Sequence, residues 1–317
     1  MKRANPLFTV IIPTYNRAKL LKKAIQSVID QTISDWELVV VDDGSTDETK
    51  ETVTKFEKEN IRYVFQKNQK LGAARNTGIK NARGKYICFL DDDDYYLENY
   101  LQVFYDWLAQ HDFPDTILRA GFIFRSLKGD INGPSYSEQK YDHPVNWAMF
   151  NFCGSVTLCL PKICFKDDQF VPGTEPWEDT HFILRILSKF PFVQLPSFTY
   201  IYVRHRVMGS IKIYTEQDTL KMVEQNINSM RSFFDHHKNI VDKYALYQAE
   251  SMIISEKYSQ HALNAMLFEK YKISFQFFRL AIKEDKRFFQ WKNYLKFLII
   301  LPLKYFFGYP KIKMIDQ

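Results

Sequence analysis

Four consecutive aspartates, Asp91 to Asp94, follow directly after the apolar run at residues 86–90. Adjacent carboxylates repel one another, so a strand end that gathers them is costly to bury unless a cation lies there. Oxygen ligands favour a hard divalent ion such as Mg²⁺ or Mn²⁺, and an ion held by one or two carboxylates keeps room for substrate phosphates. The alternative is a solvated acidic turn, but the position after a buried strand favours the metal site.

Other metal and nucleotide motifs fit this chain less well. An EF-hand loop needs Gly at its sixth position and Glu at its twelfth, where Tyr96 and Gln102 stand. A phosphatase-type DxDx[TV] signature would need Thr or Val in place of Tyr95. The sequence contains neither GxGxxG nor GxxxxGK[ST], which removes the main support for dinucleotide and P-loop sites.

The first 110 residues alternate apolar runs with helical patterns. The predicted strands are residues 8–12, 36–41, 62–65 and 86–90, and the predicted helices are 20–29, 45–56 and 72–82. Ser45 with Glu48 fits a capping box at the second helix, and Gly84 fits a C-terminal stop for the third.

Continuous apolar strands separated by helices indicate an α/β fold with a parallel sheet covered on both faces. Ligands bind at the carboxyl ends of the strands in such sheets. The polar clusters that follow the predicted strands are therefore expected to lie together: Thr14-Tyr15-Asn16, Asp42-Asp43 and Asp91 to Asp94.

Beyond residue 112 the pattern changes twice. Residues 113–150 carry loop-forming Gly and Pro, a helix is predicted from Trp177 onward, and residues 198–203 read as a strand. From about residue 215 the sequence is mostly helical, basic and aromatic. We therefore expect a first domain over 1–215, with halves 1–112 and 113–215, followed by a helical region over 216–317.

Four segments resemble, in order, the motifs of family 2 glycosyltransferases with the GT-A fold. They are residues 10–16 (VIIPTYN), 40–47 (VVDDGSTD), 72–78 (GAARNTG) and 89–94 (FLDDDD). The resemblance is strong over residues 7–110, looser to about 215 and absent beyond. It implies a Rossmann-like, mainly parallel sheet flanked by helices, with a C-terminal helical extension. It also implies an inverting transferase that moves a sugar from a nucleotide diphosphate, expected to be a UDP-sugar, to a glycan or lipid-linked saccharide.

The resemblance assigns the donor site residue by residue. Within the first motif, Pro13 and Thr14 would line the donor pocket and Tyr15 would stack on the base. Asp43 would accept a hydrogen bond from a uracil-type ring nitrogen, with Asp42 nearby. Arg75 would lie near the base or the diphosphate, where a fixed cation is useful.

The acidic run would hold both the metal and the ribose. By resemblance Asp93 is the metal ligand, with Mn²⁺ or Mg²⁺ as the cofactor, and Asp91 or Asp92 faces the ribose. Four identical residues leave the register between Asp92 and Asp93 open by one position.

Glu178-Asp179 resembles the family's acidic pair at a helix start, where the Asp is the catalytic base. An inverting transferase needs one carboxylate that removes the acceptor hydroxyl proton, and a helix N-terminus would keep Asp179 ionised. The alternative for Asp179 is a helix-capping role. In the loop after residue 203, His205 and Arg206 are candidates for contacting the phosphates, against the alternative of a solvated loop.

Charge and cysteine content exclude several other classes. The net charge is +6, from 43 basic and 37 acidic residues, and the first two thirds hold no basic cluster, so no nucleic-acid partner is expected. The cysteines have no CxxC spacing and are expected to be reduced thiols in the cytoplasm. The apolar stretch at residues 7–12 is too short for a signal segment and is followed by Pro13, so export is not expected.

Residues 288–309 combine aromatic, aliphatic and lysine side chains. Their uninterrupted apolar stretch, 297–303, is far below the ~20 residues that a spanning helix needs. A helix lying in the membrane interface fits the pattern, and so does a helix packed on protein. The first alternative predicts a peripheral protein at the inner face of the membrane, near a lipid-linked acceptor.

Three rival functions have weaker support. A processive polysaccharide synthase would carry a QxxRW segment, which is missing. A sugar nucleotidyltransferase would open with a Gly-rich loop after the first strand, where residues 13–16 read PTYN. A degenerate sugar-nucleotide-binding partner subunit would not need the intact acidic run and Asp179.

Overall fold

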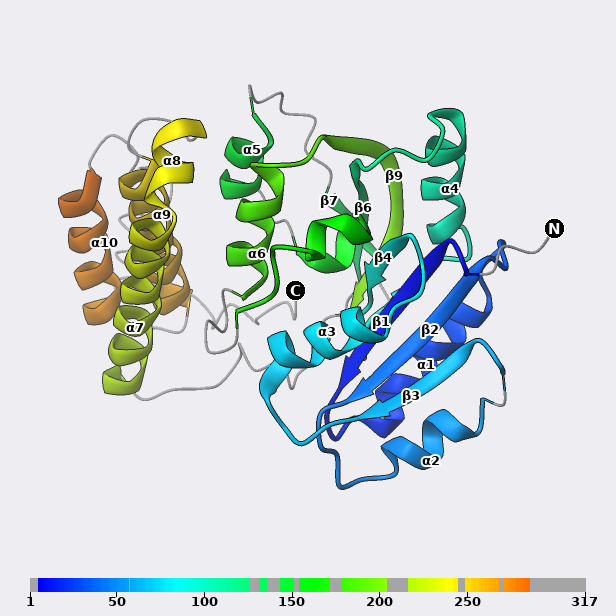
Figure 1. Cartoon of the computed structure of the whole chain (residues 1–317). Helices are drawn as coiled ribbons and strands as arrows, with labels where there is room; N and C mark the ends of the chain where they lie inside the picture. Colours follow the sequence, from blue (N-terminus) through cyan, green and yellow to red (C-terminus); the bar gives the residue numbers. More distant parts are fainter. Residues whose placement is uncertain are drawn as a thin grey trace. The chain divides into compact units, whose positions relative to one another are not determined.

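The computed structural model describes most of the chain (Figure 1). The described residues are 5–56, 58–125, 131–135, 143–150, 154–171, 178–203, 216–244, 249–267 and 271–285. The chain divides into two compact units, residues 1–206 and 207–317, against an expected boundary at 215. Each unit is described separately below.

Four parallel strands form the first half of the sheet. They are β1 (Phe8–Thr14), β2 (Trp36–Asp42), β3 (Ile61–Phe65) and β4 (Tyr86–Phe89), in the spatial order β3-β2-β1-β4. Every residue of β1, β2 and β4 is buried, because helices cover both faces of the sheet. The predicted parallel sheet is confirmed.

Helices α1 (Ala18–Ile29), α2 (Thr49–Thr54) and α3 (Lys70–Asn81) connect these strands. Figure 1 shows α3 on one face of the sheet and α1 and α2 on the other. This is the outcome of right-handed crossovers when the chain steps from β1 to β3 and then returns to β4. The apolar face of α1 is buried as the sequence period predicts, through Leu21, Ala24, Ile25 and Val28.

The sheet continues beyond β4 as a mixed sheet of nine strands in the order β3-β2-β1-β4-β8-β6-β9-β5, with β7 pairing with β6. The added strands are β5 (Tyr95–Tyr96), β6 (Ile117–Arg125), β7 (Ile131–Ser135), β8 (Leu158–Pro161) and β9 (Phe192–Val203). Strand β8 runs antiparallel to both β4 and β6, so it joins the two halves. Helices α4 (Tyr100–Gln110), α5 (Pro144–Phe150) and α6 (Glu178–Leu187) belong to this half.

An aromatic cluster packs α6 against the sheet. Phe182 of α6 stacks on Phe165 and Phe170, with ring centroids 5.2 and 4.5 Å away. Phe170 in turn meets Phe89 of β4 edge-on at 5.4 Å. These rings are buried, so the start of α6, where Glu178 and Asp179 lie, is fixed relative to the end of β4.

Two local predictions are wrong in detail. Helix α2 begins at Thr49 rather than after Ser45, and Asp47 accepts hydrogen bonds from the backbone nitrogen and hydroxyl of Thr49. Ser45 instead accepts a hydrogen bond from the backbone nitrogen of Asn16, so its hydroxyl joins two strand-end loops.

Gly84 also has a different role from the predicted helix stop. Helix α3 ends at Asn81, and Ala82 is already extended. A Cβ at Gly84 would lie 2.6 Å from the backbone nitrogen of Thr9, so this glycine allows β1 to approach closely.

Residues 113–150, where the sequence pattern is weak and Gly and Pro predict loops, contain β6, β7 and α5. Arg119 and Gly121 interrupt the apolar run of β6, so its sequence does not look like that of a buried strand. Gly121 lies against the ring of Phe198 on β9, at the point where the β6–β9 register shifts.

The second unit is helical in the residues described, as predicted. It contains α7 (Glu216–His236), α8 (Lys238–Tyr244), α9 (Ala249–Leu267) and α10 (Tyr271–Asp285). Ser255 of α9 donates a hydrogen bond to the carbonyl of Ala281, and Arg231 pairs with Glu284 at 2.6 Å. Among the described helices none is both long and apolar enough to cross a membrane. Residues 288–309 lie outside the described part of the chain.

We expect Gly84→Ala to lower the unfolding free energy by about 1–3 kcal/mol, because the added methyl group collides with the backbone of β1. Gly72→Ala is the matched control: its Cβ would meet only ordinary contacts, the nearest at 3.5 Å, inside a helix that favours alanine. Urea unfolding followed by tryptophan fluorescence measures both variants. Equal midpoints for the two would contradict the close approach.

Candidate active site

Thr14 ties together the ends of three strands. Its carbonyl accepts a hydrogen bond from the backbone nitrogen of Asp43, which follows β2, at 2.9 Å. Its hydroxyl donates to Asp92, which follows β4, at 2.7 Å. The strand-end residues that the sequence predicted to converge therefore lie together. Tyr15, the next residue after β1, keeps 48% of its surface exposed and is free to meet a planar ligand.

Asp42, the last residue of β2, and Asp43, which follows it, are both buried and hydrogen-bonded. Asp42 accepts from the backbone nitrogen of Ser45 at 2.7 Å and from the Tyr63 hydroxyl at 2.6 Å. Asp43 accepts from the backbone nitrogens of Gln69 and Lys70, at 2.8 and 2.9 Å, and from the Gln66 side chain at 2.6 Å. These bonds hold the loop that leads into α3, and so they set where Arg75 emerges.

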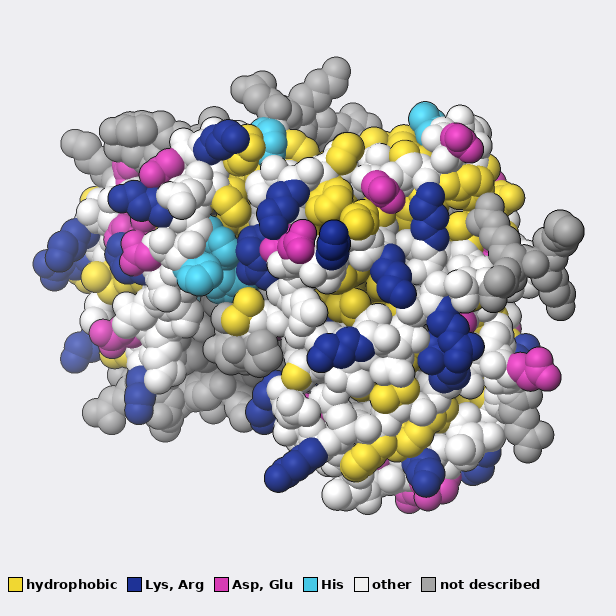
Figure 2. Space-filling model, viewed as in Figure 1, with side chains coloured by type: hydrophobic (Ala, Val, Ile, Leu, Met, Phe, Trp, Pro, Cys, Tyr) yellow, Lys and Arg dark blue, Asp and Glu magenta, His cyan; other side chains and the backbone are white. Residues whose placement is uncertain are grey.

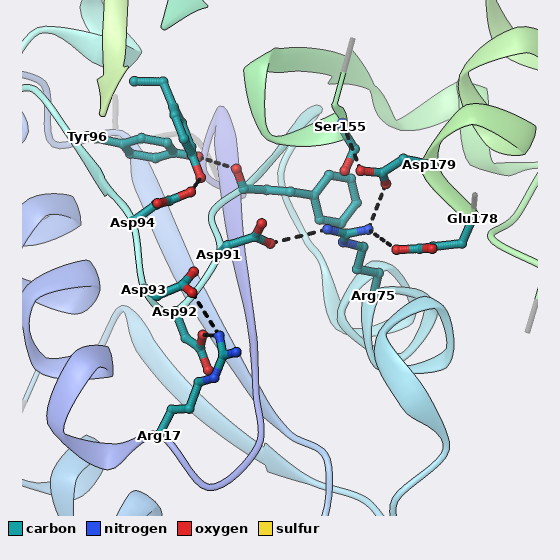
Figure 3. A network of polar contacts seen from close by, with 12 residues as sticks. Arg17, Arg75, Asp91, Asp92, Asp93, Asp94, Tyr96, Ser155, Glu178 and Asp179 are labelled. Carbon is teal, nitrogen blue, oxygen red and sulfur yellow. Dashed lines mark hydrogen bonds and ion pairs between the residues drawn. The ribbon is translucent and has the colours of Figure 1, made fainter. Parts of the chain in front are cut away.

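The four aspartates form a tight turn, closed by a hydrogen bond from the backbone nitrogen of Asp94 to the carbonyl of Asp91 at 3.1 Å. Figure 3 shows their carboxylates spreading toward different partners. Asp92 and Asp93 contact Arg17, each at 2.9 Å from Nη1. Asp94 is buried and accepts hydrogen bonds from the Tyr200 hydroxyl and from the backbone nitrogen of Val203, which anchors β9 to the turn.

Arg75 joins the acidic turn to the start of α6 (Figure 3). Its Nη2 lies 3.2 Å from Asp91, and its Nη1 lies 2.6 Å from Asp179 and 3.5 Å from Glu178. The side chain of Arg75 is almost completely buried, whereas those of Asp91 and Asp179 are 30% and 23% exposed. One guanidinium thus contacts both Asp91, a predicted ribose ligand, and Asp179, the predicted base.

Burial and neighbouring charges shift several pKa values here. Burial opposes the charge on Arg75, but Asp179, Asp91 and Glu178 outweigh it and raise the Arg75 pKa. Burial raises the pKa of Asp91, helped by Asp93 and Asp179, although Arg75 acts against it. Burial also raises the pKa of Asp92 to about 6, in spite of Arg17 and Thr14. An excess of carboxylates in a confined space is a setting in which a cation is stabilised.

Comparison with known proteins agrees with this architecture. The model of the family "Glycosyl transferase family 2" matches residues 9–163. A Rickettsia prowazekii protein described as an uncharacterized glycosyltransferase is 30% identical over 230 residues, which are 70% of this chain and 68% of that protein. The chain belongs to glycosyl transferase family 2.

A second relative is named for a specific activity. It is a GalNAc(5)-diNAcBac-PP-undecaprenol beta-1,3-glucosyltransferase of Campylobacter jejuni, 42% identical over 172 residues. The match covers 52% of this chain and 55% of that relative.

Solved structures agree with the GT-A fold. TarS of S. aureus, residues 1–349 in complex with UDP-GlcNAc, superposes with a TM-score of 0.61 at 21% identity, covering 87% of this chain and 81% of that one. The same TarS fragment in complex with UDP gives a TM-score of 0.59 at 22% identity, over 82% of this chain and 74% of that one. At this identity the likeness establishes the fold.

The acidic turn of this family 2 chain could hold a divalent cation through one or two carboxylates, but not through an enclosing cluster of ligands. In the described part of the chain, no group of three or more His, Cys, Asp or Glu side chains is arranged to enclose a metal. Asp91 and Asp93 are the members of the turn that keep exposed carboxylates, at 30% and 20%. One or two carboxylate oxygens suit a Mg²⁺-like ion whose other ligands are water and substrate phosphates.

Two features of the site escaped the sequence reasoning. Arg17 precedes α1 and contacts Asp92 and Asp93. The sequence does not indicate these contacts, because a single arginine after a motif is usually an ordinary surface residue. The bond between Tyr200 and Asp94 depends on β9 pairing with β5, which local patterns do not reveal. His205 and Arg206, predicted to contact phosphates, lie outside the described residues.

The visible face of the N-terminal unit bears its Lys and Arg side chains dispersed among uncharged and acidic ones (Figure 2). This face therefore presents no continuous basic surface in the residues described.

We expect Arg75→Met to lower the unfolding free energy by about 3–5 kcal/mol, because Glu178, Asp91 and Asp179 would be left without their buried cation. Arg185→Met is the matched control, since its partner Asp168 stays paired with Lys189 at 2.6 Å, and we expect a loss below about 1 kcal/mol. Urea midpoints of the two variants test this difference. A similar loss in both would mean that the buried cluster contributes little.

Proposed function

We propose that this chain is an inverting glycosyltransferase that moves one sugar from a UDP-sugar to a glycan or lipid-linked saccharide. The observation that carries the proposal is the bridge through Arg75, whose guanidinium contacts both Asp91 of the acidic turn and Asp179 of α6. We infer that the donor would lie on the Asp91 side of this bridge and the acceptor on the Asp179 side. An inverting displacement needs the leaving group and the base on opposite sides of the reacting carbon, and such a placement would provide for both.

The donor would lie across the ends of β1, β2 and β4. Exposed Tyr15 would stack on the base, and Asp43 with Asp42 would line the base pocket beside it. The backbone of Pro13 and Thr14 would line the bottom of the donor pocket, while Asp91 or Asp92 would face the ribose. Of these two, Asp91 has the more exposed carboxylate, at 30% against 7%, which favours Asp91 for the ribose.

The chemical step would rest on Asp179. Its carboxylate would accept the proton of the acceptor hydroxyl as that oxygen bonds to the anomeric carbon, while the bond from that carbon to the diphosphate oxygen breaks and the diphosphate leaves with the electron pair. Arg75, 2.6 Å from Asp179, would orient this carboxylate. A divalent ion held by Asp93, with Asp91 beside it, would offset the charge that develops on the diphosphate.

The donor and acceptor classes are supported by likeness. The fold neighbour TarS has been solved with UDP and with UDP-GlcNAc, which favours a uridine nucleotide here. The Campylobacter jejuni relative is named for a glucosyl transfer to an undecaprenol-linked saccharide, which favours a lipid-linked acceptor. Together they support the proposal of a role in polysaccharide or cell-envelope glycan synthesis, and we place this role at the inner face of the membrane.

We expect Asp179→Asn to lower transfer or donor hydrolysis by about 10²–10⁴-fold while the protein still binds UDP with Mn²⁺, because the base is lost but the nucleotide pocket is not. Asp93→Asn should also lower turnover, but unlike Asp179→Asn it should lose the Mn²⁺-dependent part of the UDP thermal shift. Donor hydrolysis with Mn²⁺ or with EDTA and thermal shift with UDP measure the two effects. Full turnover by Asp179→Asn would remove Asp179 from the role of base.

A lipid-linked acceptor predicts contact with the membrane surface through residues 288–309. We expect the full chain to bind vesicles of anionic phospholipid and a chain ending at residue 285 to bind them less, because aromatic and lysine side chains suit the interface. Vesicle co-sedimentation at two salt concentrations measures this. Undiminished binding by the shortened chain would rule out the segment as the anchor.

A further inference from the structure

Arg17 lies where its guanidinium reaches the middle of the acidic turn (Figure 3). A single nitrogen, Nη1, is 2.9 Å from Oδ1 of Asp92 and 2.9 Å from Oδ2 of Asp93. Arg17 directly precedes α1, whose Leu20 and Leu21 nitrogens donate to its carbonyl, so its backbone is fixed by the first turn of the helix. The contact therefore belongs to the folded scaffold rather than to a chance surface encounter.

The two carboxylates that Arg17 contacts differ in their surroundings. Asp92 is 7% exposed and also accepts a hydrogen bond from Thr14, so it is a buried, fixed anchor. Asp93 is 20% exposed, and Arg17 itself is 43% exposed. The Arg17–Asp92 contact is thus the more buried of the two. The Arg17–Asp93 contact lies nearer the surface, where solvent reaches it.

A divalent cation and this guanidinium compete for the same carboxylate. An ion bound by Asp93 would place two positive charges within a few ångströms of a third, and like charges at that distance repel strongly in a partly buried site. Arg17 also occupies Oδ2 of Asp93, so that oxygen becomes available to the ion only when the contact is released. Both requirements are met if Arg17 gives up Asp93 and keeps Asp92.

We propose that Arg17 is an internal counter-ion of the acidic turn, which neutralises Asp93 in the cation-free protein and is exchanged for the divalent cation when the donor site is loaded. This inference rests on the metal-binding role proposed above for Asp93. It gives Arg17 two measurable effects: it stabilises the cation-free fold, and it weakens cation binding by competition. Arg17 is a positioning residue in this account and takes no part in the bond changes.

The test compares Arg17→Gln with Lys22→Gln, a matched control that removes the same charge from an exposed position on the same helix. Free Mn²⁺ is counted by electron paramagnetic resonance during titration with MnCl₂ alone and with MnCl₂ plus UDP. Melting temperatures are measured in EDTA. Neither readout depends on turnover.

We expect Arg17→Gln to bind Mn²⁺ about three- to tenfold more tightly than the wild-type chain and to melt at a lower temperature in EDTA. Lys22→Gln should change neither value. Arg17→Lys keeps the charge on a shorter, non-planar head group, so its Mn²⁺ affinity should fall between those of wild type and Arg17→Gln. This second variant also tests the proposal if Arg17→Gln folds poorly.

The possible failures are distinguishable. If wild type binds Mn²⁺ with UDP but Arg17→Gln binds it equally or less tightly, the cation does not displace Arg17 from Asp93. The further inference is then wrong and the proposed function stands. If the wild-type chain binds no Mn²⁺ under either condition, the metal role of Asp93 is wrong and the exchange falls with it. Donor turnover in EDTA then reports separately whether the chain is still a transferase.

Discussion

The site depends on one buried cation, the guanidinium of Arg75. A charge this far from water is stable only if carboxylates surround it, and here they come from two separate segments, the turn after β4 and the start of α6. The arginine itself comes from α3, so three elements must arrive together before any of these charges is satisfied. The parallel half of the sheet, with α3 and the turn after β4, is therefore joined by electrostatics to the start of α6, at the point where the chemistry is proposed.

Packing makes that junction possible. The aromatic contacts of Phe182 and Phe170 fix α6 on the sheet, and β8 links the parallel half to the β6–β9 pair. Asp94 then ties the turn to β9 through Tyr200 and Val203. Apolar burial supplies most of the stabilisation in such a fold, and the polar contacts select one relative placement of the halves.

The sequence predicted the half of the fold in which each strand is a solid apolar run. Strands β1, β2 and β4 are buried on both faces, so their composition alone identifies them, and the polar residues that follow them are recognisable as a site. Strand β6 could not be identified in this way, because the charged Arg119 is buried there and Gly121 is needed against Phe198. Its character as a strand comes from pairing with segments about 40 and 75 residues further along the chain, and local patterns do not contain that information.

The register of the acidic turn shows the same limit at the scale of single residues. Four identical side chains give no basis for separate roles, yet the turn directs them to four environments: Arg75 for Asp91, Thr14 and Arg17 for Asp92, Arg17 for the outer Asp93, and Tyr200 for Asp94. Burial separates them further, because Asp92 and Asp94 are enclosed and Asp91 and Asp93 keep exposed carboxylates. The two enclosed aspartates hold the turn in shape through their hydrogen bonds. An acidic run that looks like four equivalent ligands is thus better understood as two enclosed carboxylates that fix the turn and two that keep exposed oxygens.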